Sequence, residues 1–123
     1  MSKVLFLDDE EAILNTYKRM LYCSTVDGYF AKSIEEAEKI VAENQVDLII
    51  SDYRLRQETG LDFLNKLREK NHAMPMVIIS GYAEENFIKE AMNSNVIQEY
   101  LIKPVNVDAF RTMISKYLLK EIV

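Results

Sequence analysis

The chain has 123 residues, about the length of one ordinary domain, and 49% of them are hydrophobic, which is enough to bury one substantial core. Its formal net charge of −5 argues against direct nucleic-acid binding, and no segment approaches the roughly 20 apolar residues of a membrane-spanning helix. The single cysteine, Cys23, cannot form an internal disulfide, so we expect a reducing, cytoplasmic location. We therefore expect one domain over residues 1–123 that contacts neither nucleic acid nor a membrane.

Short apolar runs alternate with segments of helical period along the whole chain, which is typical of βαβ units and a parallel sheet. Most of the runs are continuous stretches of aliphatic residues, as expected of strands that are covered on both faces. The second run is the least apolar. The five predicted strands are Lys3–Leu7, Gly28–Lys32, Asp47–Ser51, Met76–Ser80 and Glu99–Ile102.

A helix is predicted after each strand, because apolar residues recur there at helical spacing. Ser33 and Glu36 form a capping-box pattern before the second helix, and Asn106 can cap the last one. The last helix is expected to run to the end of the chain. The fold class predicted from these elements is α/β with (βα)5 architecture.

Polar residues stand at the carboxyl end of four of these strands. Asp8 and Asp9 end the first strand, Asp52 follows "DLIIS", Ser80 ends "MVIIS", and Lys103 follows "EYLI". The crevice outside the carboxyl ends of the strands is where open parallel sheets bind their ligands. We therefore expect these side chains to meet at one site.

Three carboxylates that lie close together repel one another unless a cation neutralises them. Mg²⁺ suits such a site, since it binds one or a few carboxylates and commonly shares a phosphate, so Asp8, Asp9 and Asp52 are candidate metal ligands. A carboxylate beside the metal can act as a nucleophile that accepts a phosphoryl group, and Asp52 is the candidate. Lys103 and Ser80 then supply a positive charge and a hydroxyl donor for the phosphoryl oxygens.

Four motifs of the chain, taken in order, resemble the receiver domains of two-component response regulators, such as the chemotaxis receivers. They are "LFLDDEE", "DLIISDYRL" with Gly60 eight residues after Asp52, "VIISGYA" and "EYLIKP". The resemblance covers essentially the whole chain. It implies a doubly wound, flavodoxin-like fold with strand order 2-1-3-4-5.

The resemblance also implies a role for each residue of the site. It makes Asp52 the phosphoacceptor, with the main-chain carbonyl of Arg54 completing the metal site, Mg²⁺ as the ion and Mn²⁺ as its substitute. It makes the Lys103–Pro104 peptide bond cis. Ser80 and Tyr100 resemble the family's switch pair.

The resemblance implies a signalling protein rather than an enzyme, since such a domain promotes only its own phosphorylation and dephosphorylation. The expected partner is a sensor histidine kinase or a phosphotransfer protein. The fourth helix, fifth strand and fifth helix form the candidate face for a phosphorylation-dependent homodimer. The chain is expected to be either a stand-alone regulator or the front domain of a longer protein.

Two positions depart from the family pattern. Arg56 stands where many members have Pro, four residues after the phosphoacceptor. Asn95 stands where a helix-ending Gly is common, and Asn tolerates the left-handed conformation that such a cap needs.

Two other functions stay open at this point. A phosphohydrolase of the haloacid-dehalogenase type also uses an aspartyl nucleophile with Mg²⁺, but it carries a second Asp where this chain has Arg54. A receiver-like binding module without phosphorylation is the other alternative. A nucleotide-binding domain is disfavoured, since no glycine-rich phosphate loop follows the first strand.

Overall fold

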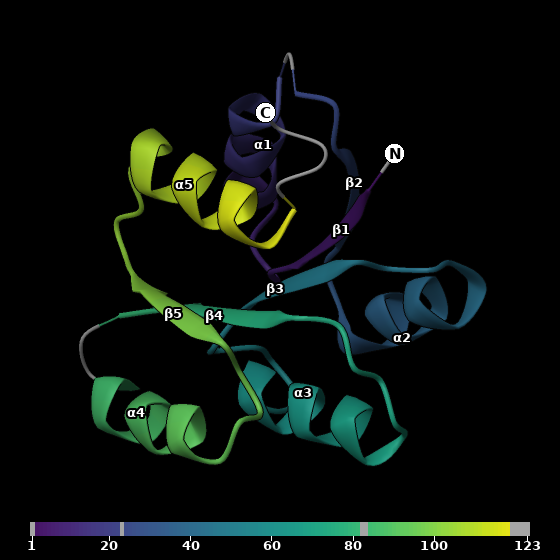
Figure 1. The fold of residues 1–123 in the computed structure, drawn as a ribbon, viewed down its shortest axis with the longest axis vertical. Helices are drawn as coiled ribbons and strands as arrows, with labels where there is room; N and C mark the ends of the chain where they lie inside the picture. Colours follow the sequence, from purple (N-terminus) through teal and green to yellow (C-terminus); the bar gives the residue numbers. More distant parts are fainter. Residues whose placement is uncertain (1, 23, 82–83, 119–123) are drawn as a thin grey trace.

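The computed structural model describes residues 2–22, 24–81 and 84–118, so Cys23 lies outside the described residues. Five parallel strands form one sheet in the order β2-β1-β3-β4-β5 (Figure 1), which confirms the predicted flavodoxin-like fold and strand order. The strands are β1 (Lys3–Leu7), β2 (Asp27–Ala31), β3 (Leu48–Asp52), β4 (Met76–Ser80) and β5 (Glu99–Ile102).

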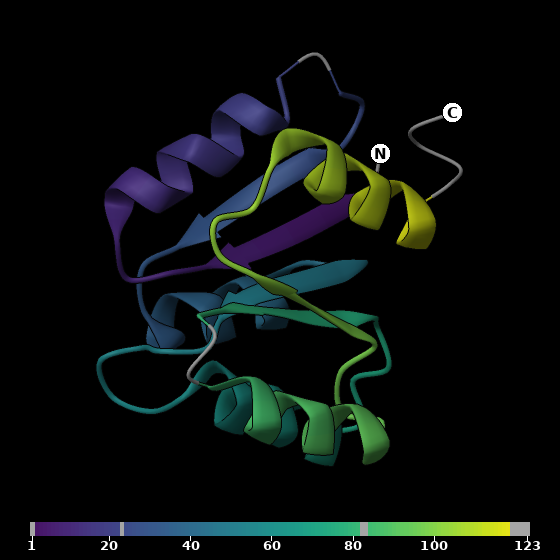
Figure 2. The same cartoon turned by 90° about the vertical axis from the view of Figure 1, so that its left-hand side faces the viewer.

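Five helices alternate with the strands and cover both faces of the sheet. Figures 1 and 2 show α1 and α5 on one face and α2, α3 and α4 on the other. Among the residues that the structure describes, no helix is both long and apolar enough to cross a membrane. The helices are α1 (Glu11–Met20), α2 (Ile34–Glu43), α3 (Gly60–Glu69), α4 (Glu85–Asn93) and α5 (Val107–Tyr117).

The sheet separates two hydrophobic cores, because successive side chains of a strand point to opposite faces. In β1, Leu5 and Leu7 belong to the core beneath α2, α3 and α4, whereas Val4 and Phe6 belong to the core beneath α1 and α5. Phe6 stacks on Tyr17 at 5.2 Å and on Phe110 at 5.8 Å between ring centroids. These ring contacts pack β1, which leads into Asp8 and Asp9, against α1 and α5.

Both bounds of β2, both bounds of β3 and the end of the last helix differ from the prediction. β2 ends at Ala31 and β3 begins at Leu48, each one residue from the predicted bound. β2 begins at Asp27, because backbone pairing starts there opposite Lys3, one residue before the apolar run. β3 ends at Asp52, because the Asp52 backbone still pairs with Ile79 although its side chain is polar. The last helix ends at Tyr117 instead of running to the end of the chain.

The predicted helix caps are confirmed. The Ser33 hydroxyl accepts the N–H of Glu36 at 3.1 Å, as in a capping box, whereas the Glu36 carboxylate accepts the N–H of Lys32, one residue before the cap, at 3.2 Å. The Asn106 side chain accepts a backbone N–H in the first turn of α5 at 2.7 Å. Asn95 has a φ of 64°, so it adopts the left-handed conformation after α4.

Candidate functional site

Three carboxylates meet at the carboxyl edge of the sheet, as the strand ends predict. Asp8 and Asp9 follow β1, and Asp52 is the last residue of β3, which is the hydrogen-bonded neighbour of β1. One carboxylate oxygen from each lies within 4.8 Å of the other two. Asp8 is fully buried, Asp52 is nearly so, and Asp9 is half-buried. This cluster is typical of a divalent metal site.

Backbone contacts hold Asp8 and Asp52 in place. The Asp8 N–H donates to Ala31 O of β2 at 3.1 Å, and its Oδ1 atom accepts the N–H of Glu10 at 2.9 Å. Behind Asp52, the start of α3 packs against the end of β3 at Gly60. A Cβ atom at Gly60 would lie 2.1 Å from the Asp52 carbonyl oxygen, so only glycine permits this approach.

Lys103 and Ser80 reach the same edge from β5 and β4. Lys103 Nζ lies 3.0 Å from Asp52 Oδ1 and 3.9 Å from Asp8 Oδ2. The Lys103 N–H donates to Ser80 O at 2.8 Å, which holds the two strand ends together. The Ser80 hydroxyl donates to the adjacent Gly81 O at 3.2 Å. The Lys103–Pro104 peptide bond is cis, as the resemblance implies.

Burial dominates the electrostatics of the cluster. It raises the pKa of Asp8 to about 6 against the lowering effect of the Glu10 N–H, and the charge of Asp52 adds to the rise. Burial also raises the pKa of Asp52, although the hydrogen bond from Lys103 opposes it. For Lys103, burial lowers the pKa, but the contact with Asp52 outweighs it and the net shift is upward. Asp8 and Asp52 therefore hold protons more readily than exposed aspartates do, and a bound cation would favour their charged forms.

The donor set fits a hard divalent cation. Within the described part of the chain, the buried Oδ2 atom of Asp8 has no hydrogen-bond partner. A buried carboxylate oxygen without a donor is costly, and a cation shared with Asp9 and Asp52 would satisfy it.

An open cleft of about 630 Å³ lies over Asp52 and contains a residue that sequence analysis missed. Its lining includes Asp9, Asp52, Arg54, Ser80, Glu84 and Lys103. Glu84 is buried and forms an ion pair with the exposed Arg54. In the sequence Glu84 looks like an ordinary first-turn acid of a helix, as Glu85 does, so no pattern distinguishes it.

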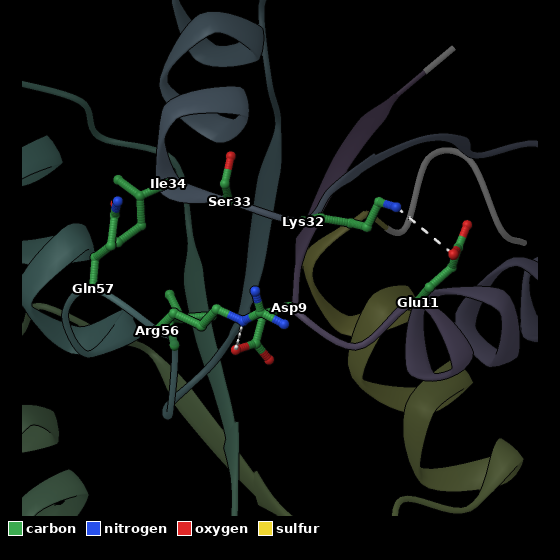
Figure 3. Close-up of a pocket in the computed structure, with 8 residues that line it drawn as sticks. Asp9, Glu11, Lys32, Ser33, Ile34, Arg56 and Gln57 are labelled. Carbon is green, nitrogen blue, oxygen red and sulfur yellow. Dashed lines mark ion pairs between the residues drawn. The ribbon is translucent and has the colours of Figure 1, made fainter.

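A second cavity of about 480 Å³ is also lined by Asp9 (Figure 3). Arg56 points across it toward Asp9, with Arg56 Nε 4.0 Å from Asp9 Oδ2. Lys32 and Glu11 form a separate ion pair of 3.7 Å at its far side. Arg56, one of the two residues that depart from the family pattern, thus places a cation beside Asp9, a candidate metal ligand.

Tyr100 lies half-buried on β5 with its hydroxyl turned to α4. The hydroxyl donates to Glu85 Oε2 at 3.0 Å, and this hydrogen bond raises the pKa of Tyr100. Glu85 also pairs with Lys89 one turn along α4, at 3.8 Å. The Tyr100 hydroxyl therefore donates to Glu85, whereas the Ser80 hydroxyl donates to Gly81 O.

The profile of the response regulator receiver domain family matches residues 4–115. The chain belongs to the response regulator receiver domain family. A receiver domain of a two-component response regulator is a signalling phosphoacceptor rather than a catalytic enzyme, which favours the receiver prediction over the phosphohydrolase alternative.

Curated relatives of this receiver domain include two transcriptional regulators. The transcriptional regulatory protein MalR of Bacillus subtilis is 33% identical over 125 residues, which cover 98% of this chain and 52% of MalR. The alginate biosynthesis transcriptional regulatory protein AlgB of Pseudomonas aeruginosa is 33% identical over 119 residues, 94% of this chain and 26% of AlgB. The chain therefore spans about half or less of these relatives.

Solved structures of receivers superpose closely on this one. A response regulator receiver domain protein from Clostridium thermocellum has a TM-score of 0.88 at 27% identity, covering 98% of this chain and 96% of its own. A two-component response regulator from Clostridium difficile has a TM-score of 0.87 at 26% identity and covers 98% of both chains. The receiver fold thus extends over nearly all of the chain.

Proposed function

We propose that this receiver domain takes a phosphoryl group from the phosphohistidine of a cognate sensor kinase or phosphotransfer protein and holds it on Asp52. The observation that carries the proposal is the 3.0 Å contact between Lys103 Nζ and Asp52 Oδ1 at the base of an open cleft. As is typical of response regulators, we place this exchange in the cytoplasm.

Asp52 is the best nucleophile of the three carboxylates. Asp8 is fully buried, and the cleft lining does not include it. Asp9 also lines the cleft, but its ion-pair partner is Arg56, whose Nε atom lies 4.0 Å from Asp9 Oδ2. Asp52 lines the cleft and has the closer cation, because Lys103 Nζ lies 3.0 Å from Asp52 Oδ1 and can also contact the oxygens of a transferred phosphoryl group.

In the transfer, one Asp52 oxygen forms a bond to phosphorus while the bond from phosphorus to the donor's imidazole nitrogen breaks. That nitrogen keeps the electron pair of the broken bond, and the imidazole takes up a proton and leaves neutral. Lys103 and the Ser80 hydroxyl stabilise the charge on the phosphoryl oxygens. Later attack by water at phosphorus returns the carboxylate and releases inorganic phosphate.

We assign the metal site to Asp8, Asp9, Asp52 and the main-chain carbonyl of Arg54, with Mg²⁺ as the ion and Mn²⁺ as a substitute. When bound, the ion offsets the negative charge shared by the carboxylates and the phosphoryl oxygens. The buried Asp8 oxygen without a hydrogen-bond donor supports this assignment.

We further propose that Ser80 and Tyr100 carry the signal to the surface formed by α4, β5 and α5. A phosphoryl group on Asp52 adds strong acceptor oxygens that draw the Ser80 hydroxyl toward them. Tyr100 then leaves Glu85 and turns inward, which changes this surface for a partner protein or a second copy of the chain.

Acetyl phosphate, a small phosphodonor, tests the phosphoacceptor directly. With Mg²⁺ it should raise the intact mass of the protein by one phosphoryl group, and hydroxylamine should remove that group as it removes an acyl phosphate. Asp52→Asn should abolish the increase. An unmodified wild-type protein under these conditions would instead favour a binding module that works without phosphorylation.

A further inference from the structure

Glu84 is an acid that the transfer chemistry does not use, although it lies in the same cleft. Its side chain is only 6% exposed, whereas that of its ion-pair partner Arg54 is 77% exposed. A carboxylate that loses water on burial depends on its partner, because an unpaired buried charge is strongly unfavourable. Arg54 is the partner that the structure gives it.

Arg54 is also two residues beyond Asp52, and both line the cleft with Lys103 and Glu84. A phosphoryl group on Asp52 would bring a charge of about −1.5 to −2 into this cleft. An exposed guanidinium can move between two anions with little loss of packing, and its planar donor fork fits phosphoryl oxygens well.

We propose that Glu84 is a positioning residue that holds the Arg54 guanidinium at the cleft until Asp52 is phosphorylated. Arg54 then turns from Glu84 to the phosphoryl oxygens and becomes the second cation of the phosphorylated site, beside Lys103. This inference rests on the proposed phosphorylation of Asp52.

The exchange reaches beyond the cleft because Glu84 adjoins the first turn of α4. That turn is held at two points, by the ion pair of Glu84 with Arg54 and by the hydrogen bond of Glu85 with Tyr100. Loss of Arg54 leaves Glu84 a buried charge without its partner, so Glu84 moves toward water. The start of α4 moves with it, and the hold on Tyr100 loosens.

The test follows the Arg54 Nε–H resonance by NMR in the whole chain, with Arg54→Lys used to assign it. The probe is beryllofluoride with Mg²⁺, a mimic of the phosphoryl group, and the Ser51 and Tyr53 amides report whether the site has filled. We expect the Arg54 resonance to move as the site fills. In the Glu84→Gln variant the Arg54 resonance should already be displaced before the probe is added. Because Glu84 no longer competes for the Arg54 guanidinium, beryllofluoride should bind roughly three- to tenfold more tightly to this variant than to the wild type.

Glu90→Gln is the matched control, because it removes the same charge from an exposed position of α4 and should leave both properties unchanged. An Arg54 resonance that stays in place while the Ser51 and Tyr53 amides shift would overturn the exchange, even with Asp52 occupied. If those amides also stay in place, the site has not filled, and the proposed function fails together with this inference.

Discussion

Lys103 Nζ lies 3.0 Å from Asp52 Oδ1, so the nearest cation to the proposed phosphoacceptor comes from a strand two positions away in the sheet. The contact joins the two central features of the site, a buried carboxylate and the loop after β5. It also compensates part of the cost of burying Asp52 and Asp8.

Lys103→Gln should therefore weaken both phosphorylation and stability. At pH 8 with a chelator present, two buried carboxylates lose their cation, and the free energy of unfolding should fall by about 1–2 kcal/mol, given that Lys103 is partly solvated. Urea unfolding measures this loss, and acetyl phosphate labelling measures the rate. Lys39→Gln, at an exposed position of α2, is the control. Equal stability of the two variants would show that the Lys103 contact contributes nothing.

The stability of the metal-free protein should depend on Asp8 between about pH 4 and pH 6. The pKa of Asp8 is about 6 in the folded chain against 3.8 ordinarily, so the folded state binds more protons across this window. The free energy of unfolding should then decrease as pH rises through it, by up to about 3 kcal/mol.

Urea unfolding at several pH values, with a chelator present, tests this dependence. Asp8→Asn cannot ionise and should lack this part of the pH profile. Mg²⁺ should stabilise the wild type above pH 6 and progressively less below it, since protons compete for the same oxygen. Parallel profiles of the wild type and Asp8→Asn would exclude Asp8 as the titrating group.

Arg56 should weaken metal binding, because its guanidinium competes for Asp9. Arg56→Gln should tighten Mg²⁺ binding up to about fivefold at low ionic strength, and the gain should shrink in salt, as expected of an exposed ion pair. Calorimetric titration with Mg²⁺ gives the Kd. Arg19→Gln on α1 removes the same charge from another exposed position and serves as the control. The competition is refuted if both variants bind Mg²⁺ alike.

The hydrogen bond from Tyr100 to Glu85 should set the resting state of the proposed switch. Glu85→Gln replaces a charged acceptor with a neutral one, so the Tyr100 ring should spend more time turned inward before any phosphoryl mimic is added. Tyrosine-ring NMR shifts with and without beryllofluoride measure this, with Glu90→Gln as the control. A Tyr100 ring that keeps one environment in every state would mean that the signal runs through other residues.

Sequence alone could predict most of the fold and the centre of the site. Runs of mainly apolar residues predicted the bounds of β1, β4 and β5 to the residue. The positions of Asp8, Asp9 and Asp52 at strand ends predicted that their carboxylates meet at one edge of the sheet. The end of β3 was missed because backbone pairing continues through Asp52, where the apolar pattern has stopped.

The ion pairs around the site could not be predicted in the same way. Arg54 with Glu84 and Arg56 with Asp9 join loops that are far apart in the sequence, through long side chains whose directions depend on tertiary packing. Periodicity and capping patterns describe one element at a time, so they carry no information about such pairs. The burial of Glu84 was likewise visible only once α4 had been placed against the cleft.

The position of the phosphoryl group is the most direct test of the proposed function. Borohydride reduces an aspartyl phosphate to homoserine, so the wild-type chain should be treated with acetyl phosphate and Mg²⁺, reduced, digested and sequenced by mass spectrometry. Homoserine should appear at residue 52 and nowhere else. Homoserine at residue 8 or 9, or its absence from a protein that has gained the mass of a phosphoryl group, would contradict the assignment of Asp52 as the phosphoacceptor.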